Sequence, residues 1–250
     1  MNSYYQEGSQ RAVEVRRLFS KIARRYDLIN DLQSAGFHRR WKRRLISLMK
    51  PESRQWILDL ACGSGDVVFE TLRSAPEAHV IGGDFTHPML KVARHRSQTG
   101  KPTPRAWIQL DGLQLPFKSA SFDRISVAYG LRNMANPFQA LQEAARILKP
   151  GGKIAILDFG KPSNAPLRGL WFFFLRTIQP FLGWLFFREA GTYRYIHESL
   201  QRYPSPSGVN QLLQDAGFDD IECLNPLWGF MSMHVASRHP SRKTVPESAR

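Results

Sequence analysis

Short apolar segments alternate with segments of helical periodicity through the middle of the chain. The apolar segments are bounded by turn residues, which is typical of strands. The segments between them carry an apolar residue every three or four positions, as one face of a helix does. Strands alternating with helices predict an α/β fold with a doubly wound, mostly parallel sheet, which binds ligands at the carboxyl ends of its strands. The five strands predicted in this region are residues 55–60, 79–85, 106–112, 122–130 and 153–160.

The two ends of the chain depart from this alternation. Residues 10–25 and 37–49 are predicted to form basic amphipathic helices, which make up an N-terminal helical cap over residues 1–50. After residue 160 the alternation stops. The Phe-, Trp- and Arg-rich residues 161–203 are therefore predicted to form a helical lid inserted into the main domain, residues 51–238.

Two further strands complete a predicted seven-stranded sheet. They comprise residues 220–226 and 230–238, and they follow a predicted helix at residues 207–218. The last residues, 239–250, are predicted to be a disordered tail.

The composition fits a single domain. A chain of 250 residues with 42% hydrophobic residues is long enough for one sizeable α/β domain and needs no second core. The two cysteines, Cys62 and Cys223, lie far apart, which fits a reducing compartment and argues against a disulfide scaffold or a zinc site. The N-terminus lacks the apolar core of a signal peptide. The most apolar segment, residues 167–189, is interrupted by Arg, Gln, Pro and Gly, so we expect no transmembrane helix.

The charge is concentrated near the N-terminus. The net charge is +14, and residues 11–54 hold thirteen Lys and Arg against four acidic residues. Basic surfaces of this kind suit anionic membranes, nucleic acids or anionic ligands. A solvated helix face is an equally good interpretation.

Acidic residues follow three of the predicted strands in order. Asp59 precedes a short glycine turn containing Gly63 and Gly65, Asp84 ends the second strand, and Asp111 with Gly112 ends the third. Glycines allow a tight turn and a close approach of the backbone to a ligand. The turn is shorter than the Gly-x-Gly-x-x-Gly of dehydrogenases, and the acid before it favours a ligand that carries a cation instead of phosphate. Asp84 is placed to accept ribose hydroxyls, and Asp111–Gly112 to contact an adenine edge.

Together, "LDLACGSGD", "GGDF", "LDG" and "LKPGG" resemble the motifs of class I S-adenosylmethionine (SAM)-dependent methyltransferases. Ala61 stands where that family usually has glycine. Within the superfamily, "YDLINDLQSAGFHRRW", "RILKPGGKIAILDFGKP" and "YGLRN" resemble the signatures of the quinone-biosynthesis C-methyltransferases of the menaquinone and ubiquinone pathways. Asp158 and Gly160 replace the usual glutamate and serine of the second signature. The resemblance covers residues 12–238.

The resemblance implies a Rossmann-like fold, SAM as cofactor and C-methylation of a reduced, demethylated prenyl quinone. The variants in "CGSGD", "YGLRN" and "LDF" favour demethylmenaquinol as the substrate, with a ubiquinone-pathway benzoquinol or another lipophilic phenol as the alternative. The expected SAM-binding residues are Asp59, Gly63, Ser64, Gly65, Asp84, Asp111, Gly112 and Ala128. No metal is expected.

Arg132, Asn133 and Tyr26 are the predicted catalytic residues. A ring carbon of a quinol is nucleophilic enough when the adjacent hydroxyl loses its proton, so the enzyme must favour a phenolate in a dry site. Arginine stays protonated, so we expect Arg132 to stabilise the phenolate or to orient a water, not to act as a base. Asn133 and Tyr26 are expected to hold or polarise the same oxygen. The competing interpretation is that Arg132 pairs with a surface acid and Asn133 caps the next turn.

Three other residues have chemistry of interest. His38 titrates near neutrality, but we expect it to form a structural hydrogen bond in preference to acting as a base. Cys62 is expected to pack as a small residue in the glycine turn. Asp158 either lines the substrate side or caps the chain.

The lid supplies apolar surface for a prenyl chain, and its arginines suit lipid headgroups. We therefore expect a cytoplasmic protein that contacts the inner face of the membrane peripherally. The competing interpretation is that the aromatic residues pack the lid onto the sheet. These aromatic residues are Trp171, Phe172, Phe173, Phe174, Phe181, Trp184, Phe186 and Phe187.

Three alternative functions fit the sequence less well. Nucleic-acid methyltransferases carry a Pro-Pro or Pro-Cys motif after the fourth strand, where this chain has Tyr-Gly-Leu-Arg-Asn, so no nucleic-acid partner is expected. A non-catalytic cofactor-binding module is disfavoured by the complete set of strand-end acids. A membrane-surface adaptor would not bind the cofactor. The oligomeric state stays open, a homodimer included.

Overall fold

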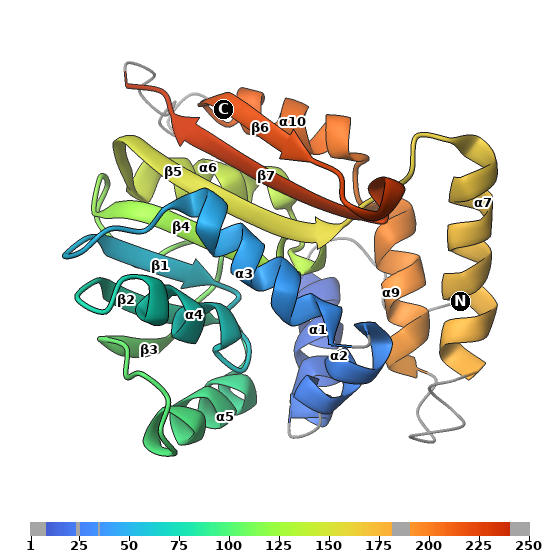
Figure 1. The fold of residues 1–250 in the computed structure, drawn as a ribbon, viewed down its shortest axis with the longest axis horizontal. Helices are drawn as coiled ribbons and strands as arrows, with labels where there is room; N and C mark the ends of the chain where they lie inside the picture. The colour runs from blue at the N-terminus through green and yellow to red at the C-terminus, as the bar shows by residue number, and fades with distance from the viewer. Residues whose placement is uncertain (1–8, 24–25, 35, 182–190, 241–250) are drawn as a thin grey trace.

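The computed structural model describes residues 9–23, 26–34, 36–181 and 191–240. Its centre is one seven-stranded sheet with the order β3-β2-β1-β4-β5-β7-β6 (Figure 1). Strands β1 to β5 are parallel, and β7 runs antiparallel to both β5 and β6. The predicted α/β fold with a mostly parallel seven-stranded sheet is confirmed. The strands are β1 (Trp56–Leu60), β2 (His79–Asp84), β3 (Ala106–Gln109), β4 (Phe122–Ala128), β5 (Leu148–Phe159), β6 (Phe218–Leu224) and β7 (Met231–Arg238).

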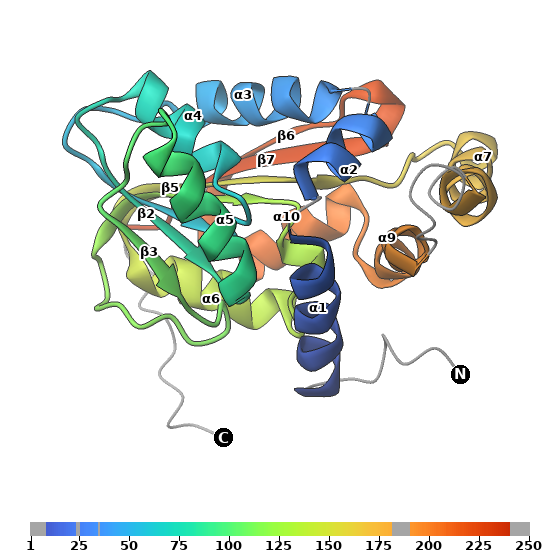
Figure 2. The same ribbon diagram turned by 90° about the horizontal axis from the view of Figure 1, so that it is seen from below.

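Helices cover both faces of the sheet (Figure 2). On one face, α3 (Phe37–Met49) and α4 (Asp66–Ser74) bury Leu45, Val68 and Leu72 against strand residues that include Val80. On the other face, α6 (Pro137–Ile147) and α10 (Pro206–Asp215) pack on a second cluster. Helix α5 (His87–Gln98) lies beside β3 and β2. Because the central strands are buried on both faces, most of their residues are apolar, as the pattern predicted, with a few buried polar residues such as Asp59 and Ser126 among them.

The N-terminal residues form three helices, one more than predicted. Helix α1 (Ser9–Ile22) ends before the predicted boundary, and α3 agrees with the prediction. Helix α2 (Tyr26–Ser34) was not predicted. It has nine residues, and the apolar Leu28 is 56% exposed, so it lacks the long apolar stripe on which helix prediction depends. The short helix places Tyr26, Asp27 and Asp31 above the carboxyl ends of the strands.

The predicted lid region is helical where it is described. Helix α7 (Ala165–Phe173) continues into a π-helical turn, Phe174–Ile178, and α9 (Gly191–Arg202) returns beside it (Figure 1). Residues 182–190 lie outside the described residues, and with them Trp184, Phe186 and Phe187. The predicted tail falls outside as well from residue 241. Among the described residues, none of the helices has the length and apolar content needed to span a bilayer.

Candidate active site

A first cavity lies at the carboxyl ends of β1, β2 and β4, and it holds about 830 Å³ of space not filled by protein atoms, including its opening to solvent. This is the edge at which parallel α/β sheets bind ligands. Five of the eight predicted cofactor residues line it, and two of the three predicted catalytic residues do as well. They are Gly63, Asp84, Asp111, Gly112 and Ala128, with Tyr26 and Asn133.

The turn after β1 has a backbone that favours glycine. Ala61, Gly63 and Gly65 have φ values of +59°, +54° and +89°, all in the left-handed region. A Cβ atom on Gly65 would lie 2.6 Å from the ring of Trp107. Ala61 has a Cβ where the related family usually has glycine. This Cβ is accommodated because the neighbouring residue is Gly130: a Cβ on Gly130 would lie 2.5 Å from the Cβ of Ala61.

Asp84 holds this turn from the end of β2. Its Oδ2 accepts a hydrogen bond from the amide of Gly63 at 2.8 Å, and its Oδ1 accepts one from the amide of Thr86 at 2.7 Å. Burial raises the pKa of Asp84, and the two backbone hydrogen bonds oppose that rise. Each oxygen keeps a further lone pair, so the carboxylate lining the cavity is able to accept hydroxyl donors.

Asp59, Ser64 and Gly65 do not line the first cavity. Asp59 is 1% exposed inside the sheet, and its Oδ1 accepts a hydrogen bond from Ser126 at 2.7 Å. Burial raises the pKa of Asp59 to about 7, against the hydrogen bond from Ser126 and the charge of Lys42. Ser64 is also buried and donates its hydroxyl to Asp27 at 2.5 Å. Asp59 and Ser64 support the glycine turn without lining the cavity. The assignment of Asp59, Ser64 and Gly65 to direct cofactor contacts remains a prediction.

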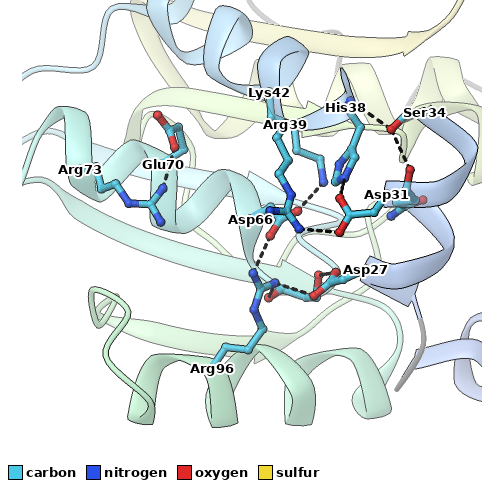
Figure 3. Close-up of polar contacts among 12 residues, drawn as sticks. Asp27, Asp31, Ser34, His38, Arg39, Lys42, Asp66, Glu70, Arg73 and Arg96 are labelled. Carbon is cyan, nitrogen blue, oxygen red and sulfur yellow. Dashed lines mark hydrogen bonds and ion pairs between the residues drawn. The ribbon is translucent and has the colours of Figure 1, made fainter. Parts of the chain in front are cut away.

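A charged cluster fixes the same turn from outside (Figure 3). Asp66, the first residue of α4, is bonded to Lys42 Nζ and to Arg96 Nη2, each at 2.8 Å. Arg96 also donates to the carbonyl of Ser64 at 2.8 Å and lies 3.1 Å from Asp27. One arginine of α5 therefore links α2, the glycine turn and α4. No local sequence pattern indicates this cluster, because the residues that bond to one another are at least 24 positions apart.

A second cavity adjoins the first and holds about 1360 Å³ of space not filled by protein atoms, including its opening to solvent. Phe19, Tyr26 and Tyr129 line both cavities, so they form the wall between them. The second cavity is mostly aromatic and apolar. Its lining includes Ile22, Phe37, Trp41, Phe159, Trp171, Phe174, Leu227 and Phe230, together with the polar residues His38, Arg132 and Gln179.

The segment after β4 brings Arg132 and Asn133 to these cavities. Arg132 is 5% exposed, and its Nη1 lies 2.5 Å from Oδ1 of Asp158 at the end of β5. Burial opposes the charge of Arg132, but Asp158 outweighs that effect and raises the pKa of the guanidinium. Asn133 donates to the carbonyl of Tyr129 at 3.0 Å and accepts from the hydroxyl of Tyr195 at 2.8 Å. Arg132 thus pairs with a buried acid, Asp158, and its charge is largely balanced.

Other predictions about single residues can be compared with the structure. His38 makes a side-chain hydrogen bond, as expected: its Nε2 lies 2.8 Å from Asp31 Oδ1. Cys62 is buried in the core beside the turn, as expected. Of the lid aromatics, Trp171, Phe172 and Phe174 pack against the core, whereas Phe173 and Phe181 are 57% and 58% exposed.

Known proteins resemble this chain over most of its length. The model of the ubiE/COQ5 methyltransferase family matches residues 6–238. The ubiquinone/menaquinone biosynthesis C-methyltransferase UbiE of Paracoccus denitrificans is 35% identical over 230 residues, which are 92% of this chain and 90% of that protein. The demethylmenaquinone methyltransferase of Thermus thermophilus is 37% identical over 222 residues, 88% of this chain and 100% of that protein. The crystal structure of a SAM-dependent methyltransferase from Thermotoga maritima shares the fold, with a TM-score of 0.63, 16% identity, and coverage of 89% and 99% of the two chains.

Proposed function

Because the chain belongs to the ubiE/COQ5 methyltransferase family, we propose that it transfers a methyl group from SAM to a ring carbon of a demethylated prenyl quinol, with demethylmenaquinol as the foremost substrate. The observation that carries the proposal is the pair of adjoining cavities with a common wall. One has carboxylates and a glycine turn, and the other is aromatic. A polar cofactor and a lipophilic acceptor can therefore meet across Tyr26 and Tyr129.

The residues of the first cavity fit SAM. Asp84 offers carboxylate oxygens for ribose hydroxyls, and Asp111 with Gly112 offers a carboxylate and an amide for the adenine edge. Gly63 lets the backbone approach closely, since a Cβ there would lie 3.3 Å from Met89 Cε. The cofactor supplies an electrophilic methyl group on a sulfonium. The neutral and aromatic side chains of the shared wall suit that cation better than a fixed anion would, because its charge is lost on transfer.

The chain's own residues would then orient the quinol and keep water out. The aromatic lining of the second cavity excludes water, which strengthens every polar interaction inside it. Tyr26 and Asn133 would hold the quinol oxygen nearest the methyl group. Arg132 would stabilise the developing phenolate, and Asp158 would fix the direction of its guanidinium.

A ubiquinone-pathway benzoquinol is the alternative acceptor, because the Paracoccus denitrificans relative is named for both pathways. The test is a methyl-transfer assay with demethylmenaquinol and a demethylated benzoquinol side by side, under reducing conditions. We expect methylation of the naphthoquinol to have the higher kcat/KM. Faster methylation of the benzoquinol would change the ring assignment, and no turnover of either would overturn the proposed function.

We also propose that the chain contacts the inner face of the membrane through an apolar rim, defined as Phe37, Leu170, Phe173, Leu227 and Trp228. Each side chain of the rim is about half exposed or more, and Trp228 is 78% exposed. Phe37 and Leu227 also line the second cavity, so the rim reaches the entrance that a prenyl chain would use. Arg40, Arg43 and Arg44 are exposed on the adjoining helix α3, and such residues attract anionic headgroups.

Vesicle flotation tests the membrane contact. The protein should float with vesicles that contain anionic lipid, and less so at high salt because the charges are screened. Replacing Phe173 and Trp228 together with serine should abolish flotation. Trp56→Ser is the matched control, because Trp56 is also exposed but lies at the amino end of β1, away from the rim. Equal flotation of the double variant and the wild type would contradict the assignment of the rim.

A further inference from the structure

His38 is a buried histidine whose two ring nitrogens have different surroundings. Nε2 lies 2.8 Å from Oδ1 of Asp31 (Figure 3), whereas Nδ1 is buried and has no hydrogen-bond partner among the described residues. Since a carboxylate only accepts, the neutral ring that suits this contact carries its proton on Nε2. Its Nδ1 then carries a lone pair and can accept a proton or a hydrogen bond. His38 lines the second cavity.

The second cavity gathers other polar atoms of the same kind. Tyr129 Oη, Trp171 Nε1 and Gln179 Oε1 are buried and have no hydrogen-bond partner in the part of the chain that the structure describes. With His38 they come from three separate segments, since Trp171 and Gln179 lie on the same continuous helix, and all four residues line this cavity. Buried polar atoms nearly always have partners, so their concentration around one cavity indicates a ligand with polar atoms on an otherwise apolar body. A quinol, with two hydroxyls on a flat apolar ring, has that chemistry.

We propose that His38 is a catalytic residue that accepts the hydroxyl proton of the bound quinol as the ring carbon is methylated, and that Asp31 is the positioning residue that orients its ring. The inference rests on the proposed function and names the proton acceptor of that reaction. It also separates the roles of His38 and Arg132. Arg132 stays charged beside Asp158 and stabilises negative charge on oxygen, while His38 removes the proton.

Methyl transfer and proton transfer to His38 together account for every bond made and broken. The ring carbon forms its bond to the methyl group with an electron pair of the ring, and the electron pair of the broken bond stays on sulfur. The electron pair of the hydroxyl O–H bond becomes the second bond of a carbonyl, and its proton goes to His38 Nδ1. Loss of the ring proton at the methylated carbon, with protonation of the carbonyl oxygen, restores the aromatic quinol. One proton is released to solvent overall.

The surroundings of His38 favour the neutral ring that this role needs. Burial lowers the pKa of His38 below its ordinary value of 6.5, and the charge of Lys42 lowers it further, against Asp31 and Asp66. The ring is therefore ready to accept a proton at pH 7, and Asp31 stabilises the cation that forms. The charged and titratable groups around it, on its own helix and on neighbouring elements, are Tyr26, Asp27, Asp31, Arg39, Lys42, Asp66, Tyr129, Arg132 and Tyr195.

The variant His38→Gln tests the role directly. The glutamine amide can reach the position of Nε2 and still donate to Asp31, but it cannot take up a proton. We expect kcat to fall by at least about 100-fold, with thermal stability and SAM affinity close to wild type. The matched control is His234→Asn. His234 is another buried histidine, it lines neither cavity, and its Nδ1 lies 2.8 Å from Asn210 Oδ1, so the asparagine amide can take the place of Nδ1. The kcat of His234→Asn should change little. A kcat of His38→Gln within about threefold of wild type would overturn the proposal.

A second measurement does not depend on turnover. With ¹⁵N-labelled histidine and S-adenosylhomocysteine bound, the Nδ1 resonance of His38 should shift when a quinol is added, and not when the oxidised quinone is added, because a quinone carbonyl has no proton to donate. Asp31→Ala should disturb the His38 resonances and lower kcat. Asp31→Asn keeps an acceptor oxygen, so its His38 resonances and its kcat should both lie closer to those of the wild type. No quinol-dependent shift would contradict the proposal. If the wild type methylates a quinol and these variants match it, only this inference fails, whereas a wild type inactive on every quinol refutes the proposed function.

Discussion

Replacing Arg132 with alanine should lower turnover by more than about 100-fold and leave SAM affinity near the wild-type value, because the arginine lines the second cavity and not the first. The same change should lower the free energy of unfolding by about 3–5 kcal/mol, since it leaves Asp158 as an unpaired charge that is 1% exposed. Steady-state kinetics, calorimetry of SAM binding and urea denaturation measure the three quantities.

The two effects can be separated by removing both charges. Arg132→Met combined with Asp158→Asn leaves no buried ion, so it should recover most of the lost stability. If Arg132 stabilises the phenolate, turnover stays low in this double variant. If turnover recovers together with stability, the arginine only supports the structure. Arg73→Met is the control, because its pair with Glu70 is half exposed and should cost less than about 1 kcal/mol.

The sheet and the strand-end acids were predictable because they depend on patterns a few residues long. A buried parallel strand is a short apolar run, and an acid at its end marks the edge of the sheet where ligands bind. Both signals are local and do not depend on the rest of the chain. Asp84, Asp111 and Gly112 were found in this way. So was Arg132, since it follows β4 directly.

What the sequence did not reveal is how distant residues combine. Arg132 is expected to stabilise a phenolate, and the competing interpretation pairs it with a surface acid. Its partner Asp158 is instead buried and lies 26 residues later, at the end of the neighbouring strand. Lys42 was counted among the basic residues of a surface helix, yet it is 7% exposed and bonded to Asp66. The periodicity of α3 places Lys42 on the same side as Leu45 and Met49, but a lysine on an apolar face shows its role only when the acid that meets it is known.

The Asp66 cluster should be the other position at which one substitution has a large effect. Asp66→Asn leaves Lys42 buried without its anion and weakens the hold of Arg96 on the glycine turn. We expect the free energy of unfolding to fall by about 3–5 kcal/mol at pH 7. SAM affinity should fall as well, because Gly63 and Ser64 lose part of the support that shapes the first cavity. Denaturation in urea and calorimetry of SAM binding test both expectations.

The loss should depend on pH in a defined direction. Burial alone would raise the pKa of Asp66, but Lys42 and Arg96 together hold it well below its ordinary value of 3.8. A carboxyl whose pKa is depressed by folding stabilises the native state above the unfolded pKa, and this contribution is lost as the pH falls toward the folded pKa. The free energy of unfolding of the wild type should therefore exceed that of Asp66→Asn by the full amount at pH 7, and this difference should shrink as the pH drops below 3.8. Glu70→Gln, in the same helix but paired with the half-exposed Arg73, should show a small difference at every pH. If the difference in the free energy of unfolding between the wild type and Asp66→Asn does not change with pH, the ion pairs with Lys42 and Arg96 do not stabilise the turn.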